Sequence, residues 1–428
     1  NLFTGPAYFI YKIASTINLC KQLKEKYSDY NFVPIYWMAT EDHDFEEINH
    51  FNLKEKKIKW ERESSGPVGR LSTEGLDKVF EEFSKAIGIG SNAEYLKELF
   101  KKSYLEHSNL AKATRFLANE LFSTEGLVII DGDDKNLKTL FAPYIKDELI
   151  HQNSFRTVSK TINQLKNYTI QVNPREINLF YIEDHLRERI ILENNIYKIN
   201  NTEIQFSEVE ILELLQNSPE KFSPNVILRP LYQEVILPNL AYIGGGGEIA
   251  YWLELKNNFN SQKVTFPILM LRNSFVVATE KQIEKIDKLH LSWSELFLPQ
   301  QELVHQKTKE ISIFKIDFSE QKETLKQQFS ELLKIAAQTD KSFIGAVKAQ
   351  EVKQIKGLEN LEKRLLKAEK RIHIDKLDRI INIQNQLFTK GSLQERKSNF
   401  SEFYSKEFIK NVISLSNPLK TEFKIIKI

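Results

Sequence analysis

Cysteine is almost absent from this chain, since Cys20 is the only one in 428 residues. One thiol excludes a disulfide framework and a zinc site built from several cysteines, so no zinc is expected. Cys20 also lies within a helical pattern over residues 11–23, where a buried small side chain is far commoner than a nucleophile. Long apolar runs are missing too, because none approaches the ~20 residues that a membrane-spanning helix needs. We therefore expect a cytoplasmic protein with no membrane partner.

An excess of charge of either sign is also missing. Lys and Arg number 60 and Asp and Glu number 58, and both signs are interspersed along the chain. A dedicated nucleic-acid-binding protein should carry a basic stripe, so no nucleic-acid partner is expected. The chain does have a hydrophobic content of 41%, which at this length predicts two or three folded units with a substantial core.

Glycine is sparse, but four glycines are consecutive: Gly244, Gly245, Gly246 and Gly247. A short apolar run precedes them and a helical pattern begins at Glu248, so the stretch predicts a strand, a turn and a helix. Residues without Cβ let a ligand approach the backbone, and the first amides of a helix favour an anion. Upstream, Arg229 and Gln233 are one helical turn apart and share one side. The pattern predicts a phosphate or carboxylate site, or a tight turn that needs glycine only for its geometry.

A group of acidic residues follows residues 32–39, an apolar run typical of a strand buried in a parallel sheet. Glu41, Asp42, His43 and Asp44 come directly after it, where open α/β sheets bind ligands. Acid–base chemistry, a Mg²⁺ site or recognition of a substrate amine would use such side chains. The alternative is a helix N-terminus whose acids complement the helix dipole. The later acids at residues 131–134 more simply indicate a loop.

The fold class predicted is α/β. Apolar runs at residues 32–39, 127–130, 239–243 and 264–271 alternate with helical patterns, which indicates an incomplete doubly wound parallel sheet. A helical insertion is expected at about residues 75–123, and a β-rich insertion at about 167–207. This core would extend over residues 1–317.

Residues 318–390 differ in character, with apolar residues at alternating spacings of three and four. The spacing predicts two helices paired as a long antiparallel coiled coil, the second over residues 343–388 and roughly 70 Å long. A rod of that length either projects or mediates a homodimer. Residues 391–428 are expected to return to the core.

Four stretches in this order resemble the cysteine-adding enzymes of bacillithiol biosynthesis: ATEDHDFEEINH, FSPNVILRPLYQE, ILPNLAYIGGGGEIAYWLELK and GSLQER. The resemblance extends over nearly the whole chain. It implies a Rossmann-like, nucleotidyltransferase-like core with connective-peptide insertions, and a coiled coil that mediates dimerisation. The family usually has a stretch ahead of LFTGP, so a further core strand is expected before residue 1.

The implied activity is that of a carbon–nitrogen ligase, which joins the carboxyl group of cysteine to the amine of glucosaminyl malate. Forming an amide from a free carboxylate needs activation, and ATP with Mg²⁺ is the expected source. The HIGH and KMSKS motifs of relatives that form acyl-adenylates are absent in recognisable form, so the adenylate route stays open.

The residues expected to contact substrate fall into groups by position. Asp42, His43 and Asp44 would bind the substrate amines together with Glu41, and His43 would be the base that deprotonates the sugar amine. The glycine turn and Arg229, with Gln233, would hold phosphate or malate carboxylates. The remaining candidates are the nucleotide-side or amino-acid-side residues Thr4, Gly5 and Tyr8, and the further anion partners Arg272 and Arg396.

Two other functions remain open. A dimeric scaffold could bind a nucleotide without catalysing a reaction, and a scaffold would not need the acid–histidine stretch and the glycine turn in one cleft. A tRNA-binding relative of synthetases is disfavoured by the even balance of charge.

Overall fold

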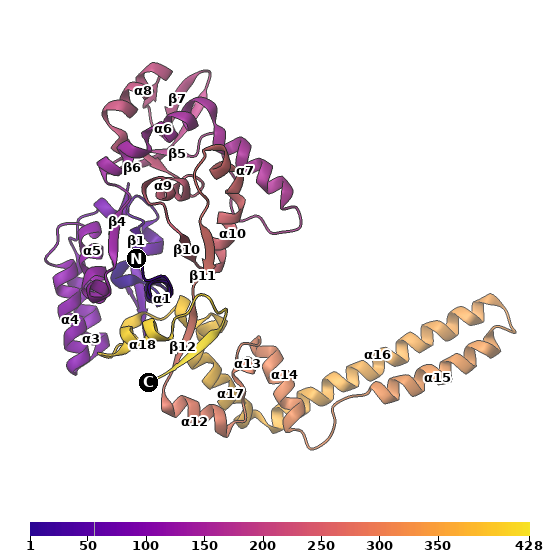
Figure 1. The fold of residues 1–428 in the computed structure, drawn as a ribbon. Helices are drawn as coiled ribbons and strands as arrows, with labels where there is room; N and C mark the ends of the chain where they lie inside the picture. The colour runs from indigo at the N-terminus through magenta and orange to yellow at the C-terminus, as the bar shows by residue number, and fades with distance from the viewer. Residues whose placement is uncertain (55) are drawn as a thin grey trace. The chain divides into compact units, whose positions relative to one another are not determined.

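The computed structural model describes residues 1–54 and 56–428, which form two compact units. The first unit comprises residues 1–277 and 394–426, and the second comprises residues 278–393 and 427–428. Figure 1 shows the elements of both units along the chain. No helix in the described part of the chain is long and apolar enough to cross a membrane.

Two pairs of parallel strands lie at the centre of the first unit. β1 (Ile35–Met38) pairs with β4 (Val128–Asp131), and β10 (Ala241–Gly244) pairs with β11 (Ile268–Leu271). Each of the four apolar runs that predict a core strand forms a strand. β1, β10 and β11 are shorter than their runs, and β4 is shifted by one residue. The residues of β4 and β11 are intermediate or exposed, so these two strands are not buried on both faces as expected. In the described residues the two pairs belong to separate two-stranded sheets, so the predicted single sheet is present as two halves.

Helices connect and cover these strands. α1 (Tyr8–Lys26) begins after Pro6 and buries Ile10, Ile13 and Ile17 at the 3–4-residue spacing of one helix face. α6 (Lys135–His151) follows β4, and its N-terminus is capped by Asp134, which accepts hydrogen bonds from the first-turn amides. α10 (Gly246–Glu254) and α11 (Lys256–Ser261) connect β10 to β11.

Three helices occupy the position of the predicted helical insertion: α3 (Leu76–Ile87), α4 (Ser91–Tyr104) and α5 (Leu110–Phe122). Their aromatic side chains surround Phe3, whose ring centroid lies 5.0 Å from that of Phe83 and 5.3 Å from that of Phe100. The buried Tyr104 hydroxyl accepts a hydrogen bond from the Phe3 amide at 2.8 Å. The insertion therefore fixes the N-terminal segment from which α1 begins.

The β-rich insertion forms a five-stranded antiparallel sheet in the order β8–β7–β6–β5–β9. The strands are β5 (Leu179–Glu183), β6 (Leu186–Glu193), β7 (Ile196–Ile199), β8 (Gln205–Phe206) and β9 (Phe222–Pro224). Asn194 and Asn195 connect β6 to β7, and both have positive φ, as a type I′ hairpin turn requires. β9 extends the sheet beyond the predicted limit of residue 207.

The other elements of the first unit are short or lie at its periphery. They are η1 (Leu2–Thr4), α2 (Phe45–Ile48), β2 (His50–Leu53), β3 (Lys56–Lys59), η2 (Val68–Arg70), η3 (Ser123–Glu125), α7 (Asn153–Gln164), α8 (Glu208–Asn217), η4 (Pro219–Lys221), α9 (Arg229–Ile236), β12 (Ser274–Ala278), η6 (Gln394–Arg396), η7 (Phe400–Glu402), α18 (Phe408–Leu415) and β13 (Phe423–Lys427).

The second unit contains an antiparallel helical hairpin of α15 (Ser319–Ala336) and α16 (Lys341–Ile372) (Figure 1). Phe329, Ala336 and Val347 are buried between the two helices, and Lys322 forms a 2.8 Å ion pair with Glu362. The predicted second helix over residues 343–388 is broken at His373, which has ψ of 18°, so α17 (Ile374–Leu387) is separate.

The remaining helices of the second unit are α12 (Glu280–Lys288), α13 (Trp293–Leu296) and α14 (Gln300–Ile311), followed after α17 by the short turn η5 (Thr389–Gly391). Gln384 of α17 donates hydrogen bonds to the carbonyls of Leu296 and Leu298. Residues 278–317 therefore fold with α17, whereas the sequence predicts that they belong to the core.

Candidate functional site

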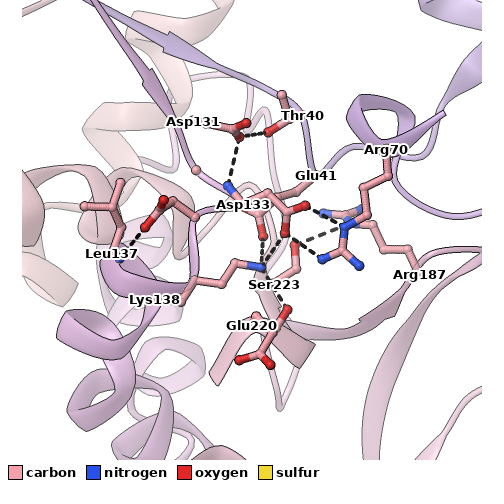
Figure 2. A network of polar contacts seen from close by, with 12 residues as sticks. Thr40, Glu41, Arg70, Asp131, Asp133, Leu137, Lys138, Arg187, Glu220 and Ser223 are labelled. Atoms are coloured by element: carbon pink, nitrogen blue, oxygen red, sulfur yellow. Dashed lines mark hydrogen bonds and ion pairs between the residues drawn. The ribbon is translucent and has the colours of Figure 1, made fainter. Parts of the chain in front are cut away.

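A network of buried charges lies where β1 and β4 end (Figure 2). Lys138 of α6 is 1% exposed, and its Nζ lies 2.8 Å from Glu41 Oε1, 3.0 Å from Asp133 Oδ1 and 3.2 Å from the Glu220 carbonyl. Burial raises the pKa of Glu41, and the charge of Lys138 opposes that rise. Lys138 thus holds together the segments that follow both strands.

Arg70 completes this network from the opposite side of Asp133. Its Nε lies 2.6 Å from Asp133 Oδ2 and its Nη2 2.8 Å from Oδ1, a two-pronged arrangement typical of arginine and carboxylate. Thr40 donates to the Asp131 carboxylate, and the neighbouring Gly69 packs so closely that a Cβ would lie 2.5 Å from Thr40 Cβ. The acids at residues 131–134 are therefore part of an organised site and not a simple loop.

His43 and Asp42 follow Glu41 and are about half exposed. The His43 Nδ1 atom lies 2.7 Å from Nη1 of Arg187 and 3.5 Å from Oδ1 of Asp42. Asp42 Oδ1 instead accepts from the His43 backbone amide at 2.8 Å. Only the contact with Arg187 is at ordinary side-chain hydrogen-bond distance. The Nδ1 atom of His43, the predicted base, is therefore already engaged by Arg187.

Arg187 lies on β6 of the inserted sheet and was not among the predicted site residues. Its side chain is 8% exposed, its guanidinium carbon lies 3.9 Å from the centre of the Phe180 ring, and its Nε lies 3.4 Å from Ser223 Oγ. Burial lowers the pKa of Arg187, and the charges of Asp42 and Glu41 oppose that shift. An arginine on a half-buried strand carries no sequence signal of function, so only the fold places it here.

Asp44, the third acid of the predicted group, caps α2. Its Oδ1 accepts from the Glu47 amide at 3.2 Å, which is the helix-terminus role weighed as the alternative for this stretch. Glu41 is buried and paired with Lys138, so it contributes to the network as a structural group. Asp42 keeps a half-exposed carboxylate beside His43.

The glycine turn lies at the C-terminal end of β10. Gly245 has φ of −75°, and none of the four glycines is among the described residues with positive φ. A Cβ added to Gly246 or Gly247 would meet no atom within 4 Å, whereas one on Gly244 would lie 3.0 Å from Tyr242 and 3.1 Å from Glu248. Backbone geometry therefore does not require glycine at residues 246 and 247, and the space beside them is open.

Charged and polar side chains surround this turn. Lys12 Nζ of α1 lies 2.6 Å from Glu248 Oε1, and the Tyr242 hydroxyl donates to the same oxygen at 2.7 Å. The other carboxylate oxygen of Glu248 accepts from the Gly245 amide at 2.9 Å. Burial raises the pKa of Glu248, but Lys12, the Gly245 amide and Tyr242 outweigh burial and lower it to about 2. Glu248 therefore caps α10 and holds a lysine at the turn.

α9 contacts α10, which follows the glycine turn, and the loop after β4. Arg229 Nη1 lies 3.0 Å from Gln233 Oε1, as their spacing predicts, and its Nη2 lies 3.4 Å from the Tyr251 hydroxyl of α10. One turn along the helix, the Tyr232 hydroxyl donates to the Gly132 carbonyl beyond β4 at 2.9 Å. Gly132 lies beside Glu41, since a Cβ added to Gly132 would be 3.2 Å from Glu41 Oε2. α9 therefore reaches the acid–histidine stretch only through the loop after β4, and the glycine turn only through α10.

The other predicted anion partners are placed differently. Arg272 is 7% exposed and forms two hydrogen bonds of 3.1 and 2.9 Å with Glu395, so its guanidinium is committed to a structural ion pair. Arg396 is exposed, and its charge acts on the Tyr8 hydroxyl. Burial, followed by the charge of Glu248, raises the pKa of Tyr8.

Thr4 and Gly5 form a strained turn before α1. Both have positive φ, and the Asn399 side-chain amide donates to the carbonyls of Phe3 and Gly5 at 2.7 Å. The Thr4 hydroxyl is buried and has no hydrogen-bond partner in the part of the chain that the structure describes. A buried polar atom without a partner is uncommon in folded proteins, which marks this turn as unusual.

The described residues of this region do not form a metal cage. Within residues 1–54 and 56–428, no group of three His, Cys, Asp or Glu side chains is placed to hold a metal ion. A surface cavity of about 390 Å³ lies elsewhere and contains none of the predicted site residues; it is lined by His107, Lys112, Arg115, Phe116, Asn119, Leu127 and Ile129.

Comparison with known proteins gives matches along the entire chain. Residues 1–273 match the family model described as "Bacillithiol biosynthesis BshC, N-terminal Rossmann-like domain", and residues 275–428 match "Bacillithiol biosynthesis BshC, C-terminal coiled-coil domain". These matches confirm the predicted fold class, a Rossmann-like core followed by a coiled coil.

Relatives from several bacteria share this similarity, and each is named "Putative cysteine ligase BshC". The protein of Flavobacterium psychrophilum is 66% identical over 430 residues, which cover 100% of this chain and 81% of the relative. That of Flavobacterium johnsoniae is 62% identical over 431 residues, covering 100% and 82%. That of Chloroherpeton thalassium is 29% identical over 429 residues, covering 94% and 76%.

Proposed function

The chain belongs to the bacillithiol biosynthesis BshC family, and from this membership we propose that it is a cysteine ligase acting on glucosaminyl malate. The reaction forms an amide between the cysteine carboxyl carbon and the sugar amine nitrogen. The oxygen lost from the carboxylate must first be made a good leaving group, and ATP with Mg²⁺ supplies that activation. The relatives' shared name supports the cysteine ligase part of this proposal.

The observation that carries the nucleotide part of the proposal is the open space beside Gly246 and Gly247. Neither φ nor packing requires glycine there, so a ligand that approaches the backbone explains the absence of side chains. Lys12 pairs with Glu248 beside the turn, and Arg229 contacts Tyr251 of α10 and is acted on by the charge of Glu248, so both would supply positive charge for phosphates. Mg²⁺ would arrive bound to those phosphates and keep several waters, which needs no cage of protein ligands.

The other substrate groups are assigned by the exposure of the side chains. The half-exposed Asp42 carboxylate would bind a substrate amine, and His43 would contact the reacting groups. Thr4, Gly5 and Tyr8 would line the nucleotide or amino-acid side. α9 contacts α10, which follows the glycine turn, and Gly132, which lies beside Glu41. We favour the enzyme over the scaffold because a scaffold does not need the two stretches to share such a neighbour.

To test this function, the purified protein would be incubated with cysteine, glucosaminyl malate, ATP and Mg²⁺, and products followed by mass spectrometry. We expect the cysteinyl amide together with AMP if an acyl-adenylate forms, or with ADP if an acyl-phosphate forms. Arg229→Ala should reduce turnover, while Arg175→Ala, at an exposed position on the loop before β5, should not. Nucleotide binding without any amide product would contradict the ligase and favour the scaffold.

A further inference from the structure

A single distance between Arg187 and His43 shows which side chain donates the hydrogen bond and which accepts it. A guanidinium has only donor atoms, and it stays protonated at any physiological pH. Because Nη1 of Arg187 lies 2.7 Å from His43 Nδ1, the imidazole atom must accept and must carry a lone pair. The ring proton of the neutral imidazole is then on Nε2. The same nitrogen is 3.5 Å from Asp42 Oδ1, too long to draw the proton back to Nδ1.

Several contacts fix the Arg187 guanidinium in place, so that it can hold His43 in the Nε2–H tautomer. It stacks on Phe180 at 3.9 Å, its Nε lies 3.4 Å from Ser223 Oγ, and the side chain is 92% buried. Phe180 also packs on the imidazole, with ring centroids 5.6 Å apart. Strands β5, β6 and β9 of the inserted sheet supply all three of these residues, so the inserted sheet determines the orientation of His43.

A carboxylate behind an imidazole makes the imidazole a better base, because it stabilises the imidazolium. A guanidinium in the same place acts differently: it donates to Nδ1, so the neutral ring keeps its proton on Nε2 and presents that N–H as a donor. Such a donor is suited to an oxygen on which negative charge develops. The predicted role of His43 as a base therefore conflicts with its contact with Arg187, because the nitrogen that stays free carries a proton instead of a lone pair.

We propose that Arg187 is a positioning residue that fixes His43 as a neutral Nε2–H donor to the cysteine carbonyl oxygen during amide formation. The proposal rests on the ligase function proposed above for its substrate, although the proton position itself does not. When the sugar amine attacks the activated carbonyl carbon, the C=O π pair moves onto that oxygen. His43 stabilises the resulting oxyanion through a hydrogen bond and gives up no proton. The electron pair then re-forms the C=O bond as the activating phosphate group leaves with the C–O bonding pair, and the attacking nitrogen loses its proton to water. Arg187 itself does not touch the substrate.

The proton position can be measured without any turnover. Long-range ¹H–¹⁵N spectra of the ¹⁵N-histidine-labelled protein, with the His43 signals identified by their loss in His43→Gln, distinguish the two neutral tautomers and the imidazolium. At pH 8 we expect the Nε2–H tautomer in the parent protein and in Arg187→Lys, which keeps a donor. Arg187→Met should give a mixture of tautomers, and the exposed-site control Arg175→Met should match the parent.

An Nδ1–H tautomer or an imidazolium in the parent at pH 8 would overturn the proposal, and so would an unchanged spectrum in Arg187→Met. Turnover gives a second measurement. A glutamine amide can place an N–H near the Nε2 position but cannot act as a base, so His43→Gln should keep kcat within about tenfold. His43→Ala should lose about 10²–10³-fold, as for other oxyanion donors. Equal losses in the two variants would show a base. Absence of turnover in the parent would reject the ligase function and leave the tautomer result standing.

Discussion

Gly246 and Gly244 belong to the same turn but differ in what a methyl group would meet. At Gly246, the first residue of α10, there is no atom within 4 Å of an added Cβ. At Gly244 the added atom would lie 3.0–3.2 Å from Tyr242, Glu248 and Ile249. The two positions therefore separate an effect on folding from an effect on a ligand.

We expect Gly246→Ala to leave the free energy of unfolding unchanged or to raise it by up to about 1 kcal/mol, because alanine favours the helix. The same variant should weaken ATP binding, because its methyl group takes up the space that we assign to phosphate. Gly244→Ala should instead lower the free energy of unfolding by about 1–3 kcal/mol through overpacking. Urea denaturation and titration calorimetry with Mg-ATP would measure both. Unchanged ATP affinity in Gly246→Ala would place the phosphates elsewhere.

The sequence reveals a site residue when its partner is close along the chain. Arg229 and Gln233 are four residues apart, and their contact follows from helical spacing. Arg187 lies 144 residues from His43, and Lys12 lies 236 residues from Glu248. Spacing contains no information about such pairs, because only the folded chain brings them together. The sequence therefore singles out His43 as a candidate, but it does not reveal the arginine that lies beside its ring.

At the level of elements, α6 carries two lysines with contrasting surroundings. Lys138 is 1% exposed and pairs with Glu41 and Asp133, whereas Lys135, three residues earlier, is 57% exposed and pairs with Glu220 at 3.2 Å. Removing one partner of a buried ion pair leaves the other charge desolvated and unpaired. Exposed pairs are screened by water and contribute little.

Lys138→Met should therefore lower the free energy of unfolding by about 3–5 kcal/mol. Lys135→Met, the matched change on the same helix, should cost less than about 1 kcal/mol. Urea denaturation followed by tryptophan fluorescence would compare the two variants. Similar losses in both would mean that Glu41 and Asp133 find other partners or water, and that the network does not hold the ends of β1 and β4 together.

The sequence predicts an element well when the residues of that element themselves show a clear pattern of apolar side chains. The apolar runs of β1, β4, β10 and β11 identify core strands because both faces of each run are apolar. β9 has three residues, Phe222–Pro224, and becomes a strand only because β5 offers it a partner. The apolar spacing of α16 continues through α17, so the break at His373 is invisible in the sequence.

On the scale of the whole molecule, the division into units also depends on distant contacts. The pattern of apolar residues changes near residue 318, where the heptad-like spacing begins. Residues 278–317 nevertheless fold with α17, because Leu296 and Leu298 accept hydrogen bonds from Gln384 almost ninety residues later. A change of composition marks where a coiled coil begins, but it does not show which helices pack at its base.

The helical hairpin leaves apolar side chains exposed beyond those that α15 and α16 bury between them. Phe343 and Leu361 of α16 are 48% and 53% exposed and lie 18 residues apart, five full turns, so they share one side of the helix. Val352 is 63% exposed and lies midway between them, on the opposite side. In a coiled coil, a partner helix normally covers apolar residues of this kind. We therefore propose that a second copy of the chain packs on the Phe343–Leu361 side.

Sedimentation equilibrium of the purified protein should then give a homodimer. Leu361→Lys should convert it to a monomer, because the new charge would have to be buried without a partner. Val352→Lys, the same change on the other side of α16, should leave the dimer intact and so controls for any effect on the hairpin itself. A dimer lost equally in both variants would mean that the helices are damaged, and a dimer kept in both would place the contact outside this side of α16. In either case, the exposure of Phe343 and Leu361 would require another explanation.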